Sequence, residues 1–169
     1  IAAETYSKIG DMIINPDDIQ IVTDDRQYGY RNKIEFSFIE LPDRTISLAF
    51  FARGQKYRIP AEGSLLAEPV INETAQSILS WIQKQKIPIR SLKTLILRTD
   101  GAGHAVAALF LKDKLSFKNY SKLTNTLLGF HIYYSTHLSP ASVPTELLYS
   151  EGQNYLIADL KGTKLKFGL

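Results

Sequence analysis

Alternating apolar and polar positions predict a pair of antiparallel strands in the first third of the chain. Over residues 30–40, apolar side chains occupy one face of an extended chain, with Asn32 as the polar exception, and charged or small polar side chains occupy the other. A turn at 41–44 precedes a second alternating segment over 45–53, so the two segments are expected to form a hairpin. After a further tight turn, residues 57–59 can continue the meander.

Apolar residues spaced three to four apart predict two main helices. Over residues 70–86 they form one continuous stripe, with Pro69 at a position where the first helical turn tolerates proline and Pro88 just beyond the end. Ser116 is a candidate N-cap for the second helix, which is expected over residues 117–128.

The remaining pattern adds short elements around this frame. A short amphipathic helix is expected over residues 2–14, and the Asn-Pro-Asp-Asp sequence that follows it is typical of a turn. Further strands are expected over residues 19–23, 92–99, 104–112, 130–135, 155–159 and 164–169. The pattern therefore predicts a single domain over residues 1–169, of the α+β class, with a mainly antiparallel sheet built from β-hairpins and two main helices.

Composition narrows the chemistry that these residues can perform. The 169 residues include no cysteine, which excludes disulfides, thiolate metal sites, cysteine-bound iron–sulfur clusters and a cysteine nucleophile within them. No apolar run approaches the roughly 20 residues of a membrane span and no signal peptide opens the sequence, so no membrane partner is expected.

The net charge of +3 mildly favours an anionic partner. The sequence begins at Ile1 and its single methionine is Met12, so we expect a processed protein or a piece of a longer one.

Three groups of residues are weak candidates for a site. The Asp-Gly-Ala-Gly-His sequence at 100–104 is the only glycine-rich loop, but a strand-like segment follows it, so a hairpin turn is favoured over a ligand loop. His104, His131 and His137 lack the spacing of metal ligands. The adjacent carboxylates at 17–18 and 24–25 are better explained as solvated turns than as a metal site.

The basic and aromatic stretch over residues 28–33 is the stronger candidate. Strand alternation places Arg31 and Lys33 on one exposed face, where their cationic groups can bind phosphates, and Tyr28 can stack on a base. Arg53 and two further cations lie across the predicted hairpin. An ordinary solvated sheet face remains an alternative interpretation of the same residues.

At this stretch the sequence resembles a known family. The segment YGYRNKIEFSF at 28–38 resembles the GYRNK segment of the RNA uridine 5-methyltransferases, which use S-adenosylmethionine to make 5-methyluridine in tRNA or ribosomal RNA. Residues 48–54, 59–67 and 165–167 are similar, in the same order, to later segments of that family. The resemblance implies the central, substrate-side domain of such an enzyme and an RNA partner, with Arg31, Lys33 and, less specifically, Arg53 contacting RNA.

The resemblance also implies what these residues do not supply. The family's nucleophilic cysteine, its proton-abstracting glutamate and its glycine-rich cofactor loop all lie beyond the position that matches Leu169. We therefore expect this chain to be inactive alone, with S-adenosylmethionine bound by a separate catalytic domain of the same protein. Ser64 occupies the position of a cluster cysteine, so no iron–sulfur cluster is expected. The family assignment and the absence of export signals together suggest a cytoplasmic location.

Two alternatives to a methyltransferase fragment remain open from the sequence. The chain can instead be a stand-alone RNA-binding module, or a protein-interaction domain without a role in nucleic-acid binding. A protein-interaction domain would not bind RNA, whereas a methyltransferase fragment and an RNA-binding module would both bind it with an affinity that falls as salt rises.

Overall fold

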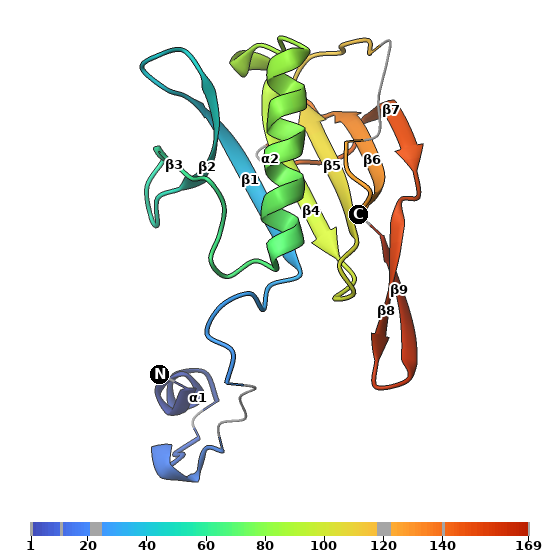
Figure 1. Ribbon diagram of the computed structural model, residues 1–169. Coiled ribbons are helices and arrows are strands. Elements are labelled where there is room, and N and C mark those ends of the chain that lie inside the picture. The colour runs from blue at the N-terminus through green and yellow to red at the C-terminus, as the bar shows by residue number, and fades with distance from the viewer. Residues whose placement is uncertain (1, 11, 21–24, 118–122, 140, 169) are drawn as a thin grey trace.

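The computed structural model describes residues 2–10, 12–20, 25–117, 123–139 and 141–168 (Figure 1). Two short 3₁₀ turns lie at Pro16–Asp18 and Ile89–Ser91. The helices are α1 (Ala2–Gly10) and α2 (Pro69–Lys84), and the strands are β1 (Lys33–Glu40), β2 (Ile46–Phe51), β3 (Arg58–Pro60), β4 (Leu92–Thr99), β5 (Ala105–Leu111), β6 (Leu127–Tyr134), β7 (Glu146–Gly152), β8 (Tyr155–Leu160) and β9 (Thr163–Gly168).

The strands form one large sheet and one separate hairpin. The large sheet has the order β3-β2-β1-β4-β5-β6-β7, and β8 pairs with β9 alone. Every recorded pair of strands is antiparallel except β5 with β6. The predicted α+β class with a mainly antiparallel sheet is therefore confirmed.

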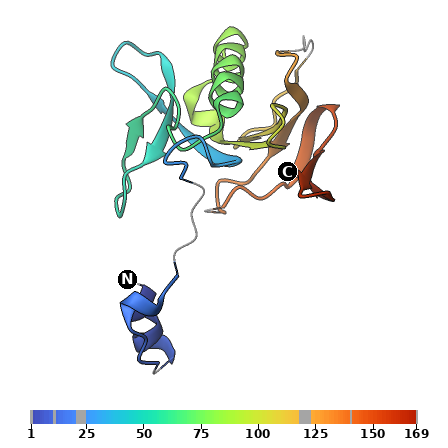
Figure 2. The same cartoon turned by 60° about the horizontal axis from the view of Figure 1, so that its bottom comes forward.

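The core lies between α2 and one face of the sheet. Helix α2 crosses this face in front of β1 and β4, as Figures 1 and 2 show. The apolar residues of α2 recur on a single side of the helix, and this side is buried. Fully burying one such Ile or Leu stabilises the fold by roughly 1.5–3 kcal/mol. Aromatic packing extends the core at one end, where the Trp81 ring lies 5.4 Å from those of Phe130 and Phe117.

The opposite face of the sheet is covered at one end and open at the other. Over β5 the residues on this face, Val106, Ala108 and Phe110, are buried, and β8 contacts β5. Leu156 of β8 is buried as well, and the guanidinium of Arg98 lies 5.9 Å from the Phe167 ring of β9. Among the described residues, neither β8 nor β9 forms a comparable contact with β1 to β3. We call this part of the face the open face and define it by Lys33, Glu35, Ser37, Phe51 and Arg58, which alternate with side chains directed at the core.

Lys93 anchors the segment between β6 and β7 to the start of β4. Its Nζ atom lies 2.8–3.0 Å from the Ser135 hydroxyl and from the carbonyl oxygens of Thr136, Ser139 and Ala141. Burial, together with the nearby charge of Lys112, lowers the pKa of Lys93. The segment is therefore held by one side chain that reaches several backbone acceptors.

Most of the elements expected from the sequence are present, with bounds that differ by a few residues. The strand over 92–99 and the helix over 70–86 are confirmed, and so are the hairpin over β1 and β2 and the short β3. The first helix ends at Gly10 rather than at residue 14. The expected strand over 19–23 is not formed at 19–20, and residues 21–23 lie outside the described residues.

The second main helix, expected over 117–128, is wrong for the described part of that range. Residues 117 and 123–126 are not helical, and residues 127–128 begin β6. Thr and Asn are weak helix formers, and the hydroxyl of Thr124 accepts a hydrogen bond from the backbone N–H of Leu127. Residues 118–122 lie outside the described residues.

Strand β7 was not expected from the sequence. It is an edge strand whose side chains are largely exposed, so its apolar pattern is weak. Gln153, the residue after β7, approaches β6 so closely that a Cβ on Gly129 would lie 1.8 Å from its carbonyl oxygen. Gly152 has a φ of +74°, which favours glycine at this contact.

Candidate nucleic-acid interface

The four residues predicted to contact RNA are all exposed. Tyr28 and Arg31 precede β1, and Lys33 is its first residue. Arg53 lies in the turn between β2 and β3, where the backbone N–H of Ala52 donates to the carbonyl oxygen of Tyr57. The residues thus lie on two separate segments, one before β1 and one between β2 and β3.

The segment that carries Tyr28 and Arg31 is held in place by residues 64–68. The backbone N–H groups of Gly29 and Arg31 donate to the carbonyl oxygens of Leu65 and Leu66 at 2.9 and 2.7 Å. The Arg31 carbonyl oxygen accepts from the N–H of Glu68 at 3.0 Å. These bonds fix the backbone of Arg31 and leave its side chain exposed to solvent.

Helix α2 in turn fixes residues 62–68. The Asn72 side chain accepts a hydrogen bond from the N–H of Ser64 at 2.9 Å and donates to the Ser64 carbonyl oxygen at 3.1 Å. Gln76 donates to the carbonyl oxygen of Glu62 at 2.6 Å. The exposed cation at position 31 is therefore connected to the core through two layers of hydrogen bonds.

Lys33 faces another cation across the sheet. In the antiparallel register of β1 and β4 it lies directly opposite Arg98, and like charges in this arrangement repel. The buried Nε atom of Arg98 has no hydrogen-bond partner in the described part of the chain. An anion near this pair would relieve the repulsion.

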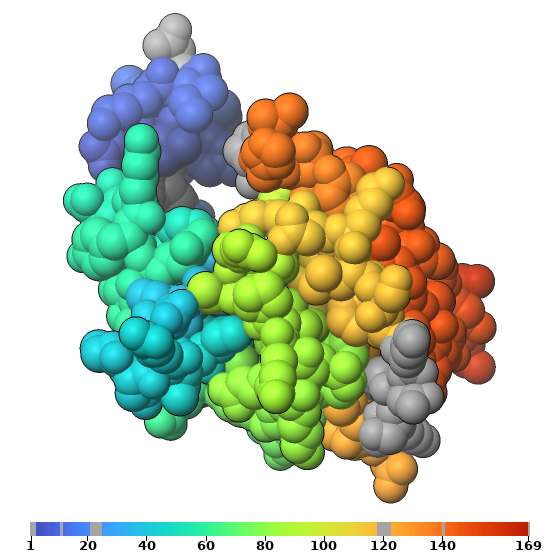
Figure 3. Space-filling view, turned by 90° about the horizontal axis from the view of Figure 1, so that it is seen from above, coloured from blue at the N-terminus to red at the C-terminus, as the bar shows by residue number. Residues whose placement is uncertain are grey.

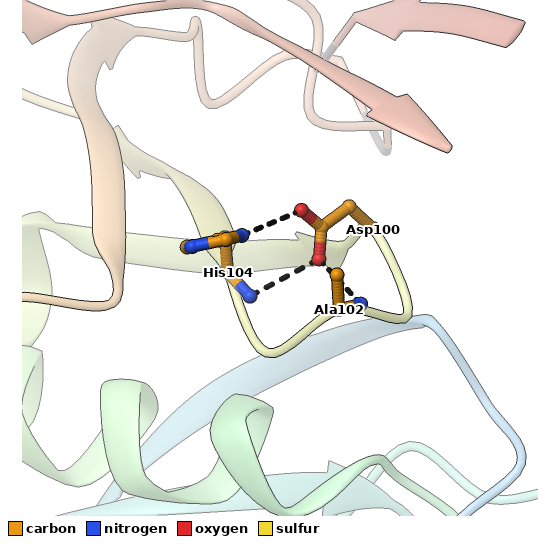
Figure 4. Close-up of polar contacts among 3 residues, drawn as sticks. All are labelled: Asp100, Ala102 and His104. Carbon is orange, nitrogen blue, oxygen red and sulfur yellow. Dashed lines mark hydrogen bonds and ion pairs between the residues drawn. The ribbon is translucent and has the colours of Figure 1, made fainter. Parts of the chain in front are cut away.

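The glycine-rich sequence at 100–104 forms the hairpin turn between β4 and β5, as predicted (Figure 4). The Asp100 carboxylate accepts hydrogen bonds from the backbone N–H groups of Ala102 and His104, and its second oxygen lies 2.8 Å from Nδ1 of His104. Burial alone would raise the pKa of Asp100, but the bonds from His104 and Ala102 outweigh it and lower that pKa. The loop's polar groups thus stabilise the turn itself.

The glycine-rich turn does not fit an S-adenosylmethionine site. Such a site needs glycines between a strand and the N-terminus of a helix, whereas β5 follows this loop.

The other weak candidates have structural surroundings. The buried His131 ring contacts the Ser150 hydroxyl and the Gln153 carbonyl oxygen, and His137 is exposed. Asp17 and Asp18 lie in a 3₁₀ turn, while Asp24 lies outside the described residues. No group of three or more metal-ligating side chains that could hold an ion occurs in the described ranges. Neither helix that the structure describes is long and apolar enough to cross a membrane.

Sequence reasoning did not identify Phe51 or Arg98. Both lie on the face of the sheet away from α2, and their placement depends on which strands pair and in what register. The available signal was the pair Phe50-Phe51, in which strand alternation must direct one ring away from the core.

Comparison with solved structures identifies a shared fold. No family model matches the sequence, and no curated protein matches it. The chain is similar to the crystal structure of Pyrococcus abyssi tRNA (uracil-54, C5)-methyltransferase in complex with S-adenosyl-L-homocysteine, with a TM-score of 0.69 and 15% sequence identity. The two proteins share a fold. The match covers 98% of this chain and 41% of the methyltransferase, so this chain spans less than half of the protein that it resembles.

Replacing Asn72 with alanine tests the support of the Arg31 segment. We expect Asn72→Ala to lower the free energy of unfolding by about 1–2 kcal/mol, because the half-buried N–H of Ser64 loses its acceptor. Hydrogen exchange should also accelerate at the amides of residues 64–68. Glu73→Ala, at the exposed neighbouring position, is the control and should change neither quantity. Unchanged exchange at 64–68 in Asn72→Ala would contradict the assignment.

Replacing Asp100 with asparagine tests the turn through its pH dependence. A carboxylate with a lowered pKa contributes stability above its unfolded-state pKa of roughly 3.9, and this contribution is lost as pH falls through the folded-state value. At neutral pH the free energy of unfolding of Asp100→Asn should therefore be about 0.5–1.5 kcal/mol lower than that of the unmodified protein. In acid the difference between the two proteins should be smaller. Thermal denaturation across this pH range measures it, with the exposed Asp18→Asn as control. A difference that does not change with pH would rule out the carboxylate as its source.

Proposed function

We propose that this chain is the RNA-facing part of an S-adenosylmethionine-dependent methyltransferase that makes 5-methyluridine in tRNA or ribosomal RNA. The observation that carries the proposal is the segment around Arg31 and Lys33. It bears the sequence resemblance, it is exposed, and its backbone is fixed by residues 64–68. The fold shared with a tRNA (uracil-54, C5)-methyltransferase supports the same assignment.

In this proposal the chain binds and orients RNA and does not perform the chemistry. Arg31 and Lys33 bind backbone phosphates through charge-assisted hydrogen bonds, which position the RNA without reading its sequence. Tyr28, which is 61% exposed, offers an aromatic surface for an unpaired base, and Arg53 adds a cation from the turn between β2 and β3. Methyl transfer, and binding of the methyl donor, belong to a catalytic domain of the same protein acting beside this one in the cytoplasm.

The charge of the surface is consistent with this role. None of Arg31, Lys33, Arg53, Lys56 and Arg58 forms a salt bridge to another described residue. An unpaired surface cation can exchange its counterions for RNA phosphate, and the released ions drive the association. The affinity for RNA is therefore expected to fall as salt rises.

Replacing both Arg31 and Lys33 with alanine tests the proposal. If each side chain neutralises one phosphate of a single strand, the slope of log K against log salt should become shallower by roughly 1.4. Affinity should fall for RNAs of different sequence alike, because phosphate contacts carry no sequence information. The melting temperature should change little, since both side chains are exposed. Fluorescence anisotropy with a labelled oligoribonucleotide, titrated at several salt concentrations, measures the slope.

The matched control is a double variant with the same charge change on the helix side of the molecule. Lys84 ends α2 and Arg90 lies in the following 3₁₀ turn, and both are exposed. Lys84→Ala with Arg90→Ala should leave the salt slope close to that of the unmodified protein. Equal losses in the two double variants would mean that the chain binds RNA by net charge alone. Unchanged binding with a large loss of stability in Arg31→Ala/Lys33→Ala would show that this pair is structural.

A further inference from the structure

Strand β1 changes its pairing partner in the middle of the sheet. Its residues 33–36 pair with β4, whereas its residues 37–40 pair with β2. The recorded ladder between β1 and β2 stops at Ser37 and Ala49, so the two strands are not paired beyond that point. A cavity of about 190 Å³ lies at this fork, lined by Glu35, Phe36, Ser37, Ala49, Phe50, Phe51 and Thr94.

The polar groups around this cavity are available to a ligand. Ser37 is only 7% exposed, yet its hydroxyl has no hydrogen-bond partner among the described residues. The exposed Glu35 carboxylate likewise makes no ion pair or hydrogen bond with them. The Ser37 hydroxyl itself is not fully buried, so it can exchange water for a polar group of a ligand at the cavity.

The wall of the cavity carries a flat aromatic surface. Phe51 is 57% exposed, although Phe50 beside it packs against the core. In the register of β2 and β3, Phe51 lies opposite Arg58, whose guanidinium is 4.9 Å from the centre of the Phe51 ring. An aromatic ring and a guanidinium plane are the two protein surfaces on which unpaired RNA bases stack.

Charge next to this ring fits a polyanion. The hairpin over residues 51–58 contains Arg53, Lys56 and Arg58 and no acidic residue. It projects at one flank of the molecule, shown in teal in Figure 3, with a hollow between it and the orange part of the chain. Among the residues that define the open face the acidic one is Glu35, which lines the cavity itself. Phosphates beside the hairpin would thus meet cations, and a base at the cavity would meet an aromatic ring and polar side chains.

We propose that the cavity at the β1 fork and the Phe51–Arg58 pair bind one unpaired nucleotide of an RNA strand. The base stacks on Phe51 and Arg58, the Ser37 hydroxyl and the Glu35 carboxylate bond to its polar edge, and the hairpin cations contact the flanking phosphates. A cavity of about 190 Å³ is smaller than the roughly 300 Å³ at which pockets for drug-sized ligands begin, so it suits part of a single planar ring. This inference rests on the proposed RNA-binding function and assigns it a second, distinct contact.

Variants of Phe51 test the stacking contact. The probe is a short single-stranded oligoribonucleotide with one 2-aminopurine, whose fluorescence is quenched when the base stacks. Phe51→Ala and Phe51→Leu should weaken binding by roughly 5- to 100-fold and reduce the quenching. Phe51→Tyr keeps a ring of similar shape and should retain both. Stacking involves no counterion, so the salt slope should be unchanged in the Phe51 variants, while Arg58→Ala should make it shallower by roughly 0.7.

The design separates failure of this site from failure of the proposed function. Phe51→Leu keeps an apolar side chain at a half-exposed position, and its melting temperature reports whether the fold is intact. If Arg31→Ala/Lys33→Ala weakens binding and Phe51→Leu does not, the nucleotide site is wrong and the RNA-binding function stands. If Phe51→Leu weakens binding but Phe51→Tyr does so equally, the stacking contact is also overturned. If the unmodified protein binds no oligoribonucleotide, both proposals fail.

Discussion

The packing of α2 against one face of the sheet is the interaction on which the rest of the structure depends. It buries the apolar stripe of the helix together with the inward side chains of β1, β4 and β5, and so fixes the positions of the central strands. Because each strand alternates its side chains, this single contact also decides which residues are directed away from the helix. The character of the open face thus follows from the core, although none of its residues takes part in that core.

The same helix positions the candidate interface from its polar side. Asn72 and Gln76 bind the backbone of residues 62–64, and the following residues bind the backbone before β1. One face of α2 therefore holds the sheet, while its flank holds the segment that carries Arg31. This arrangement combines a hydrogen-bonded backbone with exposed charged side chains, which suits the proposed contact with a phosphate backbone.

Asymmetry between the two ends of the sheet localises the proposed function. The β8–β9 hairpin lies against the β5 end, where the face away from α2 carries apolar residues. At the β1 to β3 end the same face carries cations, the exposed ring of Phe51 and the Ser37 hydroxyl, which forms no hydrogen bond with another described residue. The first end is built for packing, and the second has the composition of a surface that binds a polyanion.

Local periodicity was sufficient to predict the elements of the core. Residues 92–99 form a short segment rich in leucine, isoleucine and threonine that ends at a glycine-rich turn, which favours a strand. Residues 70–86 carry one apolar stripe at helical spacing, which favours a helix. The helix predicted over residues 117–128 was wrong because Leu127 and Leu128 fit a helix and a strand equally well. Their strand pairs in parallel with β5, and that pairing depends on contacts between residues distant in sequence. Strand β7 was missed because an exposed edge strand has little apolar pattern.

Some residues of the candidate site could be predicted from the sequence, and others only from the paired strands. Arg31 and Lys33 were found because they are adjacent in a recognisable segment. The Phe51–Arg58 pair and the isolated Ser37 hydroxyl were not, because both arise from register: the first from β2 pairing with β3, the second from the change of partner along β1. A sequence pattern shows which residues share a strand face, whereas cross-strand neighbours require the completed sheet.

Hydrogen exchange in the presence of single-stranded RNA tests the central claim most directly, namely that RNA binds on the side away from α2. The account predicts slower exchange at the amides of residues 28–33 and of the hairpin between β2 and β3, with exchange in α2 unchanged. Protection confined to α2 and the turn after it, or no protection anywhere at saturating RNA, would contradict it.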